Sequence, residues 1–105
     1  MGLLSLLFGS GNSKLQNIKT ALNAGALIVD VRSSAEYASG HAKGSINMPL
    51  SVLQSGVKKL KNTSSVVLCC RSGARAASAQ IILNSHGIQS INAGSWQTVE
   101  SALKN

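Results

Sequence analysis

Short, largely apolar runs alternate with helix-forming segments along this chain of 105 residues, and this alternation constrains the fold more than any other feature. Residues 27–31 and 65–70 have the continuous apolar character that is typical of strands buried on both faces of a sheet. Residues 45–48 and 88–93 predict two further short strands. Strands joined by helices through short loops predict an α/β domain, with a mainly parallel central sheet and helices on both faces.

Helices are predicted between these strands from capping residues and from the spacing of apolar side chains. Ser33 and Glu36 form a capping box at the start of a short helix, which Gly40 ends. The other predicted helices and their inward-facing positions are 13–25 (Leu15, Ile18, Leu22), 51–60 (Leu53, Val57, Leu60), 74–86 (Ala77, Ile81, Ile82) and 96–103 (Trp96, Val99, Leu103).

One domain is expected over residues 13–105, preceded by residues 1–12, a short apolar segment that continues into a connector rich in glycine and serine. Residues 3–8 are apolar but far shorter than the roughly 20 residues that a membrane span needs. No Lys or Arg precedes them, whereas a secretory signal begins with a positive region. We therefore expect a cytoplasmic monomer without a membrane span.

The net charge of +7 raises the possibility of nucleic-acid binding. Only 3% of the residues are aromatic, so few rings are available to stack on bases, and we expect no nucleic-acid partner. The one dense basic cluster, Lys58, Lys59 and Lys61, is interpreted as a solvated face or a docking surface for an acidic protein. The adjacent Cys69 and Cys70 lack the C-x-x-C spacing of a zinc site, and we expect no metal.

Cys70 is the residue with the clearest chemical role. It ends a predicted strand and precedes a tight loop and an alanine-rich helix, so backbone N–H groups and the helix dipole converge on its sulfur. With Arg71 and Arg75 nearby, each factor favours the thiolate, and such surroundings lower a cysteine pKa to roughly 3.5–7.5. Cys70 is thus a candidate nucleophile, although most free cysteines are inert and buried. Cys69 points to the opposite face, because side chains alternate along a strand, and is expected to be inert.

Two charged residues follow another predicted strand. Asp30 and Arg32 lie at the end of the run 27–31, and the carboxyl ends of parallel strands form the edge at which ligands bind. We expect these residues to form a charged pair that braces the edge beside the Cys70 loop, since buried pairs more often orient than react.

Three motifs occur in order along the chain. They are Asp30-Val31-Arg32, Glu36-x-x-x-Gly40-His41-Ala42-Lys43-Gly44-Ser45-Ile46-Asn47-Met48-Pro49, and Cys70-Arg71-Ser72-Gly73-Ala74-Arg75. From about residue 14 to residue 103 the chain resembles the rhodanese-like domains, the single-domain sulfurtransferases. Ala93-Gly94-x-Trp96 is a weaker echo of a fourth family motif. Departures from the family pattern are Ala42, Ala76 and the additional Cys69.

The resemblance implies a sulfurtransferase in which Cys70 is the catalytic nucleophile. It implies that an anion such as thiosulfate donates its sulfane sulfur to form a Cys70 persulfide. Cyanide, a thiol or a protein cysteine would then accept that sulfur, with no cofactor. The residues that would bind the substrate, through backbone N–H groups and the two arginine side chains, are Arg71, Ser72, Gly73, Ala74 and Arg75.

Other functions stay open at this point. The same fold can act as a non-catalytic binding module or as a sulfur carrier for one dedicated partner. A phosphatase or arsenate reductase needs an arginine six positions after the cysteine, where this chain has Ala76. Redox chemistry between Cys69 and Cys70 is disfavoured, because strand geometry points their side chains apart.

Overall fold

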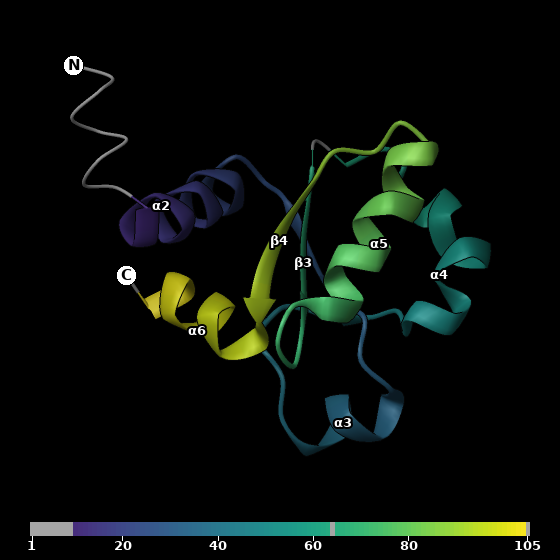
Figure 1. The fold of residues 1–105 in the computed structure, drawn as a ribbon, viewed down its shortest axis with the longest axis horizontal. Coiled ribbons are helices and arrows are strands. Elements are labelled where there is room, and N and C mark those ends of the chain that lie inside the picture. Colours follow the sequence, from purple (N-terminus) through teal and green to yellow (C-terminus); the bar gives the residue numbers. More distant parts are fainter. Residues whose placement is uncertain (1–9, 64, 105) are drawn as a thin grey trace.

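The computed structural model describes residues 10–63 and 65–104. The described strands form one all-parallel sheet in the order β2-β1-β3-β4, with helices on both faces, so the predicted α/β fold is confirmed. In chain order the elements are α2 (Ser10–Asn23), β1 (Leu27–Asp30), α3 (Ser34–Ser39), β2 (Ile46–Asn47), α4 (Leu50–Gly56), the 3-10 helix η1 (Val57–Leu60), β3 (Val66–Cys70), α5 (Ala74–Ser85), β4 (Ser90–Ser95) and α6 (Trp96–Lys104) (Figure 1).

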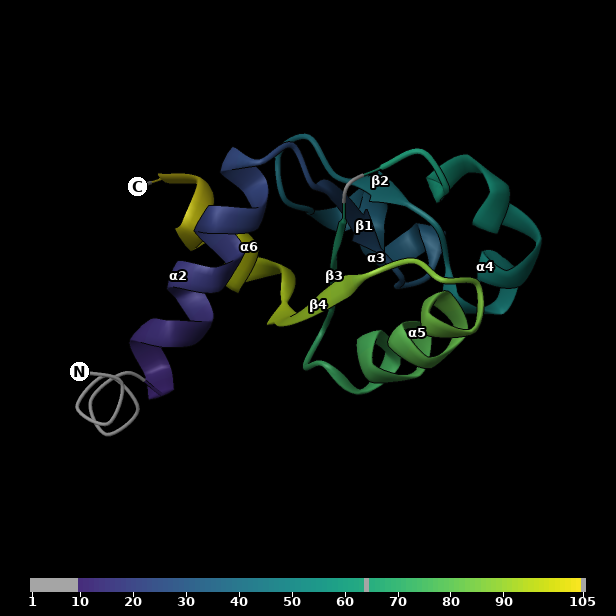
Figure 2. The ribbon, with the colours of Figure 1, turned by 90° about the horizontal axis from the view of Figure 1, so that it is seen from above.

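Helices α2 and α6 pack against one face of the sheet, and α4 and α5 cover the other (Figures 1 and 2). Strand β3 lies between β1 and β4, and every one of its residues is buried. Alternate side chains of β3 therefore enter two separate hydrophobic cores. Cys69 belongs to the core under α2 and α6, and Cys70 to the core under α4 and α5, which confirms that the two thiols point to opposite faces.

The register of the sheet gathers the predicted site residues at one edge. Asp30 lies opposite Cys69 in the β1–β3 pair, and the N–H of Val31 donates to the Cys69 carbonyl at 3.0 Å. Because the strands are parallel, their carboxyl ends meet at this edge. Asp30, Arg32 and Cys70 are thus brought together, as the sequence predicted. Helix α3 lies below this edge in Figure 1.

Helix α5 presents a different face to the core from the predicted one. Ala77 and Ile81, which were expected to point inward, are exposed, Ile81 to 71%. Ile82 packs against the core, as expected. Apolar side chains occur almost all the way round this helix, so their spacing does not select one face. The loop before α5 determines the face instead, because it joins the first turn to Cys70. The buried positions are Ala76, Ala79 and Leu83.

Smaller differences concern the starts of two helices and the inward face of a third. Helix α2 begins at Ser10, inside the predicted connector, because extending an existing helix costs little once its packed part has formed. The domain boundary at residue 13 itself stays a prediction, and residues 1–9 lie outside the described residues. Helix α4 starts after Pro49, one residue before the predicted Ser51. In α6, Val99 and Ala102 face inward, whereas Leu103 is 42% exposed.

The predicted ends of α3 and the predicted inward positions of α4 and η1 are confirmed. The capping box between Ser33 and Glu36 is present, and Gly40 ends α3. Leu53, Val57 and Leu60 are buried under the sheet. No helix within residues 10–63 and 65–104 is long and apolar enough to cross a membrane.

Candidate active site

The loop between β3 and α5 wraps around the sulfur of Cys70. Gly73 caps α5 in a left-handed conformation, with φ +109°, and its N–H donates to Cys70 Sγ at 2.9 Å. Any side chain at Gly73 would be strained, and its Cβ would lie 3.3 Å from the Cα of Gly94. The loop therefore needs glycine both for its backbone conformation and for its close contact with β4. The side chains of Arg71, Ser72 and Ala74 are exposed around it.

The pKa of Cys70 lies below its ordinary value. Burial has the largest single influence and raises this pKa, but four backbone N–H groups together outweigh it, because they hydrogen-bond to the thiolate. These groups belong to Ala76, Gly73, Ser72 and Arg75. Backbone donors, rather than the arginine charges that the sequence analysis also invoked, are thus the main source of activation. The N–H of Ala76 was not expected, although its place in the first turn of α5 is a signal that could have indicated it.

Cys69 has the opposite surroundings. It is fully buried in the core under α2 and α6. Burial, followed by the nearby Asp30 carboxylate, raises the pKa of Cys69 to about 12. This thiol is therefore protonated and inaccessible at neutral pH, as expected for an inert cysteine. Among the described residues, no three His, Cys, Asp or Glu side chains gather as metal ligands would.

Arg75 turns its guanidinium toward helix α3. Its Nη1 and Nη2 donate to the two carboxylate oxygens of Glu36 at 2.7 and 3.1 Å. Glu36 also accepts the N–H of Ser33 as part of the capping box. This second role of Glu36 was not predicted, and the only signal for it in the sequence is the scarcity of acidic residues in a strongly basic chain. Glu36 thus joins the start of α3 to the Cys70 loop.

This pairing predicts an unusual titration for Glu36. The hydrogen bonds from Arg75, and then from the Ser33 backbone, lower the pKa of Glu36 to about 2. Because this pKa is depressed, the pair stabilises the fold above the ordinary pKa of about 4.3 and is lost as the pH falls toward 2. We expect the Glu36 carboxyl carbon to titrate near pH 2 by NMR and Arg75→Met to raise the midpoint toward 4. A wild-type midpoint near 4 would contradict the pair.

Asp30 and Arg32 form the expected charged pair. The Nε of Arg32 donates to Asp30 Oδ1 at 2.9 Å, and its Nη2 donates to Oδ2 at 2.8 Å. The side chain of Asp30 is fully buried, and Arg32 is 4% exposed. Arg32 also donates to the Gly40 carbonyl at 2.6 Å, and its guanidinium lies 5.1 Å from the centre of the Trp96 ring. The pair therefore ties the edge of the sheet to α3 and α6.

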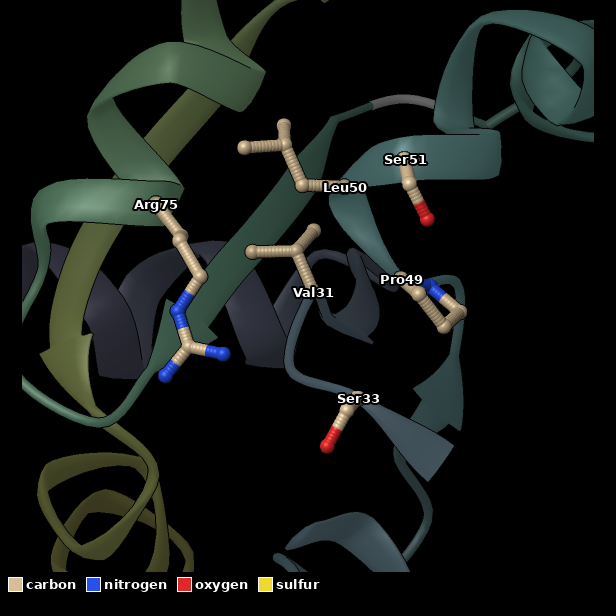
Figure 3. A pocket seen from close by; sticks show the side chains of 6 residues that line it. All are labelled: Val31, Ser33, Pro49, Leu50, Ser51 and Arg75. Carbon is tan, nitrogen blue, oxygen red and sulfur yellow. The ribbon is translucent and has the colours of Figure 1, made fainter. Parts of the chain in front are cut away.

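A cavity of about 370 Å³ opens beside the loop (Figure 3). Figure 3 shows the apolar side chains of Val31 and Leu50 on the side that faces Arg75. Val31 follows β1 and is hydrogen-bonded to the backbone of Cys69, so the cavity lies next to the end of β3. An apolar wall beside a guanidinium suits a small anion or the carbon part of a thiol. The lining residues are Val31, Ser33, Pro49, Leu50, Ser51 and Arg75.

Comparison with protein families gives one match that covers most of the chain. Residues 14–102 match the family described as Rhodanese-like domain. No curated protein sequence matches the chain.

Several solved structures share the fold. A human single-domain sulfurtransferase, TSTD1, is 27% identical with a TM-score of 0.65, over 87% of this chain and 94% of that chain. A rhodanese with anions from E. coli is 26% identical with a TM-score of 0.65, over 70% of this chain and 91% of that chain. The reduced CoADR-RHD of Bacillus anthracis is 25% identical with a TM-score of 0.68. That alignment covers 86% of this chain but 16% of that chain, so this chain spans a small part of the larger protein.

Proposed function

Because this chain belongs to the rhodanese-like domain family, we propose that it is a sulfurtransferase with Cys70 as its catalytic nucleophile. The observation that carries this proposal is the group of backbone N–H donors around the Cys70 sulfur, with the Gly73 nitrogen at 2.9 Å. A lowered pKa increases the fraction of Cys70 that is thiolate at a given pH, and the thiolate is the nucleophilic form. The same N–H groups can hold the negative charge of a second sulfur atom. The fold shared with a human sulfurtransferase and an E. coli rhodanese supports the proposal.

The reaction is a double displacement. The Cys70 thiolate attacks the outer sulfur of a donor such as thiosulfate, and a new S–S bond forms while the S–S bond of the donor breaks. The electron pair of the broken bond leaves with sulfite, and Cys70 carries a singly charged persulfide. An acceptor then attacks the terminal sulfur of the persulfide and forms a bond to it. The S–S bond of the persulfide breaks, and its electron pair returns to the sulfur of Cys70. Neither step needs an external oxidant or reductant, so the proposal includes no cofactor.

The loop residues have separate proposed roles. The exposed Arg71 side chain attracts the anionic donor to the mouth of the loop. Ser72, Gly73, Arg75 and Ala76 supply the N–H groups around the reacting sulfur. Ala74 begins the helix turn that holds the last two of them in place. Arg75 is paired with Glu36, so it orients the loop and places positive charge at the side of the cavity. Asp30 and Arg32 support the edge of the sheet without a proposed chemical step.

The acceptor is proposed to enter through the cavity beside Arg75. A volume of about 370 Å³ admits a small thiol or the tip of a partner protein that carries a cysteine. We further propose a cytoplasmic monomer with its domain at residues 13–105. The two cysteines are both free thiols, the form that a reducing compartment preserves.

Intact-mass spectrometry of the purified protein tests this function. Treatment with thiosulfate is expected to add about 32 Da, the mass of one sulfur atom, and cyanide is expected to remove it as thiocyanate. Rapid turnover with cyanide or small thiols would identify a free enzyme. A persulfide that forms but transfers its terminal sulfur only slowly to small acceptors would identify a dedicated carrier. No added mass on a protein whose Cys70 is still readily alkylated would contradict sulfur transfer from thiosulfate.

A further inference from the structure

Strand β4 contains one extra residue opposite the end of β3. Leu68 pairs with Asn92, whereas Cys70 pairs with Ser95, so three steps along β4 match two steps along β3. Gly94 lies inside this bulge with φ +85°. Bulges near active sites redirect side chains that a regular strand would point elsewhere. The bulge coincides with the motif Ala93-Gly94-x-Trp96, which has no role in the proposed reaction.

The side chain of Asn92 spans the distance from this bulge to the Cys70 loop. Its Oδ1 accepts the N–H of Gly94 at 2.9 Å, and its Nδ2 donates to the carbonyl of Gly73 at 3.0 Å. Both ends of the amide thus have a partner, which defines the direction in which it points. The Gly73 carbonyl also accepts the N–H of Ala77 at 2.9 Å. Gly73 is therefore held at its carbonyl while its N–H points at the sulfur.

Gly73 needs such a restraint for a physical reason. Glycine passes easily between left-handed and right-handed conformations, so the loop backbone is not fixed by its own residue type. The position of a Cβ on Gly73 lies 3.6 Å from Asn92 Oδ1 and 3.8 Å from Nδ2, so the amide also packs against this part of the backbone. A rotation of the Gly73 backbone would break the Asn92 hydrogen bond together with the bond to sulfur.

We propose that Asn92 is a positioning residue for sulfur transfer: by holding the Gly73 carbonyl, it aims the Gly73 N–H at the Cys70 sulfur. This inference rests on the proposed role of Cys70 as the nucleophile. Asn92 does not touch the sulfur itself in this role. It acts through Gly73, and its loss is expected to weaken the stabilisation of both the thiolate and the persulfide.

The titratable groups around the loop lie on elements other than β4. Arg75 of α5 and Cys69 of β3 interact electrostatically with Cys70, and Asp30 of β1 interacts with Arg75. Lys14 of α2 places its ammonium 3.1 Å from the position of a Cβ on Gly94. Strand β4 contains no titratable side chain. Replacing Asn92 by an apolar residue therefore changes hydrogen bonding without changing any charge.

The test is the pH dependence of Cys70 alkylation in the full chain with Asn92→Leu, a change that nearly conserves size. The midpoint of the alkylation profile is expected to rise by about one pH unit. At pH values below both midpoints, the variant then has roughly tenfold less Cys70 thiolate than the wild type. The rate of persulfide formation from thiosulfate is expected to fall with it. If Asn92→Leu does not fold, Asn92→Ala serves, because it removes the same hydrogen bonds with a smaller side chain.

Gln80→Leu is the matched control. Gln80 also joins α5 to β4 through a side-chain amide, with its Nε2 donating to the Ser90 carbonyl at 3.3 Å, but it lies away from the loop. The midpoint of the alkylation profile of Gln80→Leu is expected to equal that of the wild type. An unchanged midpoint in both Asn92 variants would overturn the inference, as would an equal rise in Gln80→Leu. Because alkylation needs no sulfur donor, a wild type that forms no persulfide would refute the proposed function alone.

Discussion

Cys70→Ser is expected to lose sulfur transfer by roughly a thousandfold or more, to the level of the uncatalysed reaction. A serine hydroxyl is not ionised near neutral pH, and it cannot carry the sulfur as a persulfide. The loop should otherwise remain, because serine is close to cysteine in size and the backbone donors around it are unchanged. Thiocyanate production from thiosulfate and cyanide measures the loss, and intact mass should show no added sulfur.

Cys69→Ser is the control for this experiment, since it makes the same change one residue earlier. Cys69 faces the other core, so sulfur transfer by the folded variant should stay within about twofold of the wild type. Its stability should fall by about 1–3 kcal/mol, because the new hydroxyl is buried among apolar side chains. Loss of activity in Cys69→Ser, or retained activity in Cys70→Ser, would contradict the assignment of the nucleophile.

Asp30→Ala is expected to lower the free energy of unfolding by about 3–5 kcal/mol. The substitution leaves Arg32 with its charge uncompensated, and Arg32 is held almost fully buried between Gly40 and Trp96. Domains of this size are stable by only about 5–15 kcal/mol, so the variant should approach the limit of folding. Urea denaturation followed by circular dichroism measures the change.

The double variant Asp30→Ala with Arg32→Met separates the loss of a partner from the loss of the pair. Removing both charges should recover part of the stability, because no buried charge is then left alone. Glu36→Ala breaks the half-exposed pair with Arg75 and should cost less than Asp30→Ala. If Asp30→Ala proved no more damaging than Glu36→Ala, the buried pair would not have the structural role that its burial indicates.

The parts of the fold that the sequence predicted correctly depend on short-range rules. Strand β3 and the first three residues of β1 are apolar because both faces of these strands are covered. The capping box of α3 involves residues three positions apart. The opposite orientations of Cys69 and Cys70 follow from the alternation of side chains along any strand. The inward face of α5 was not predictable, because its apolar side chains surround the helix.

The candidate site was predictable to the same extent. The loop around Cys70 is local, so its backbone donors could be expected from the start of a helix. The pair of Glu36 and Arg75 joins residues 39 positions apart, and no spacing rule indicates such a contact. The contact of Asn92 with Gly73 depends on the bulge in β4, which arises only when β4 pairs with β3.

Because Cys69 and Cys70 lie on opposite faces of the sheet, labelling of the two thiols can measure how often the sheet separates from α2 and α6. Cys69 is closed off by α2 and α6, with a pKa of about 12, whereas Cys70 has a pKa below its ordinary value. A thiol reagent therefore labels Cys70 in the closed protein, and it reaches Cys69 only in molecules whose sheet has separated from those helices. The rate at which doubly labelled chains accumulate reports how often that separation occurs, without any engineered residue.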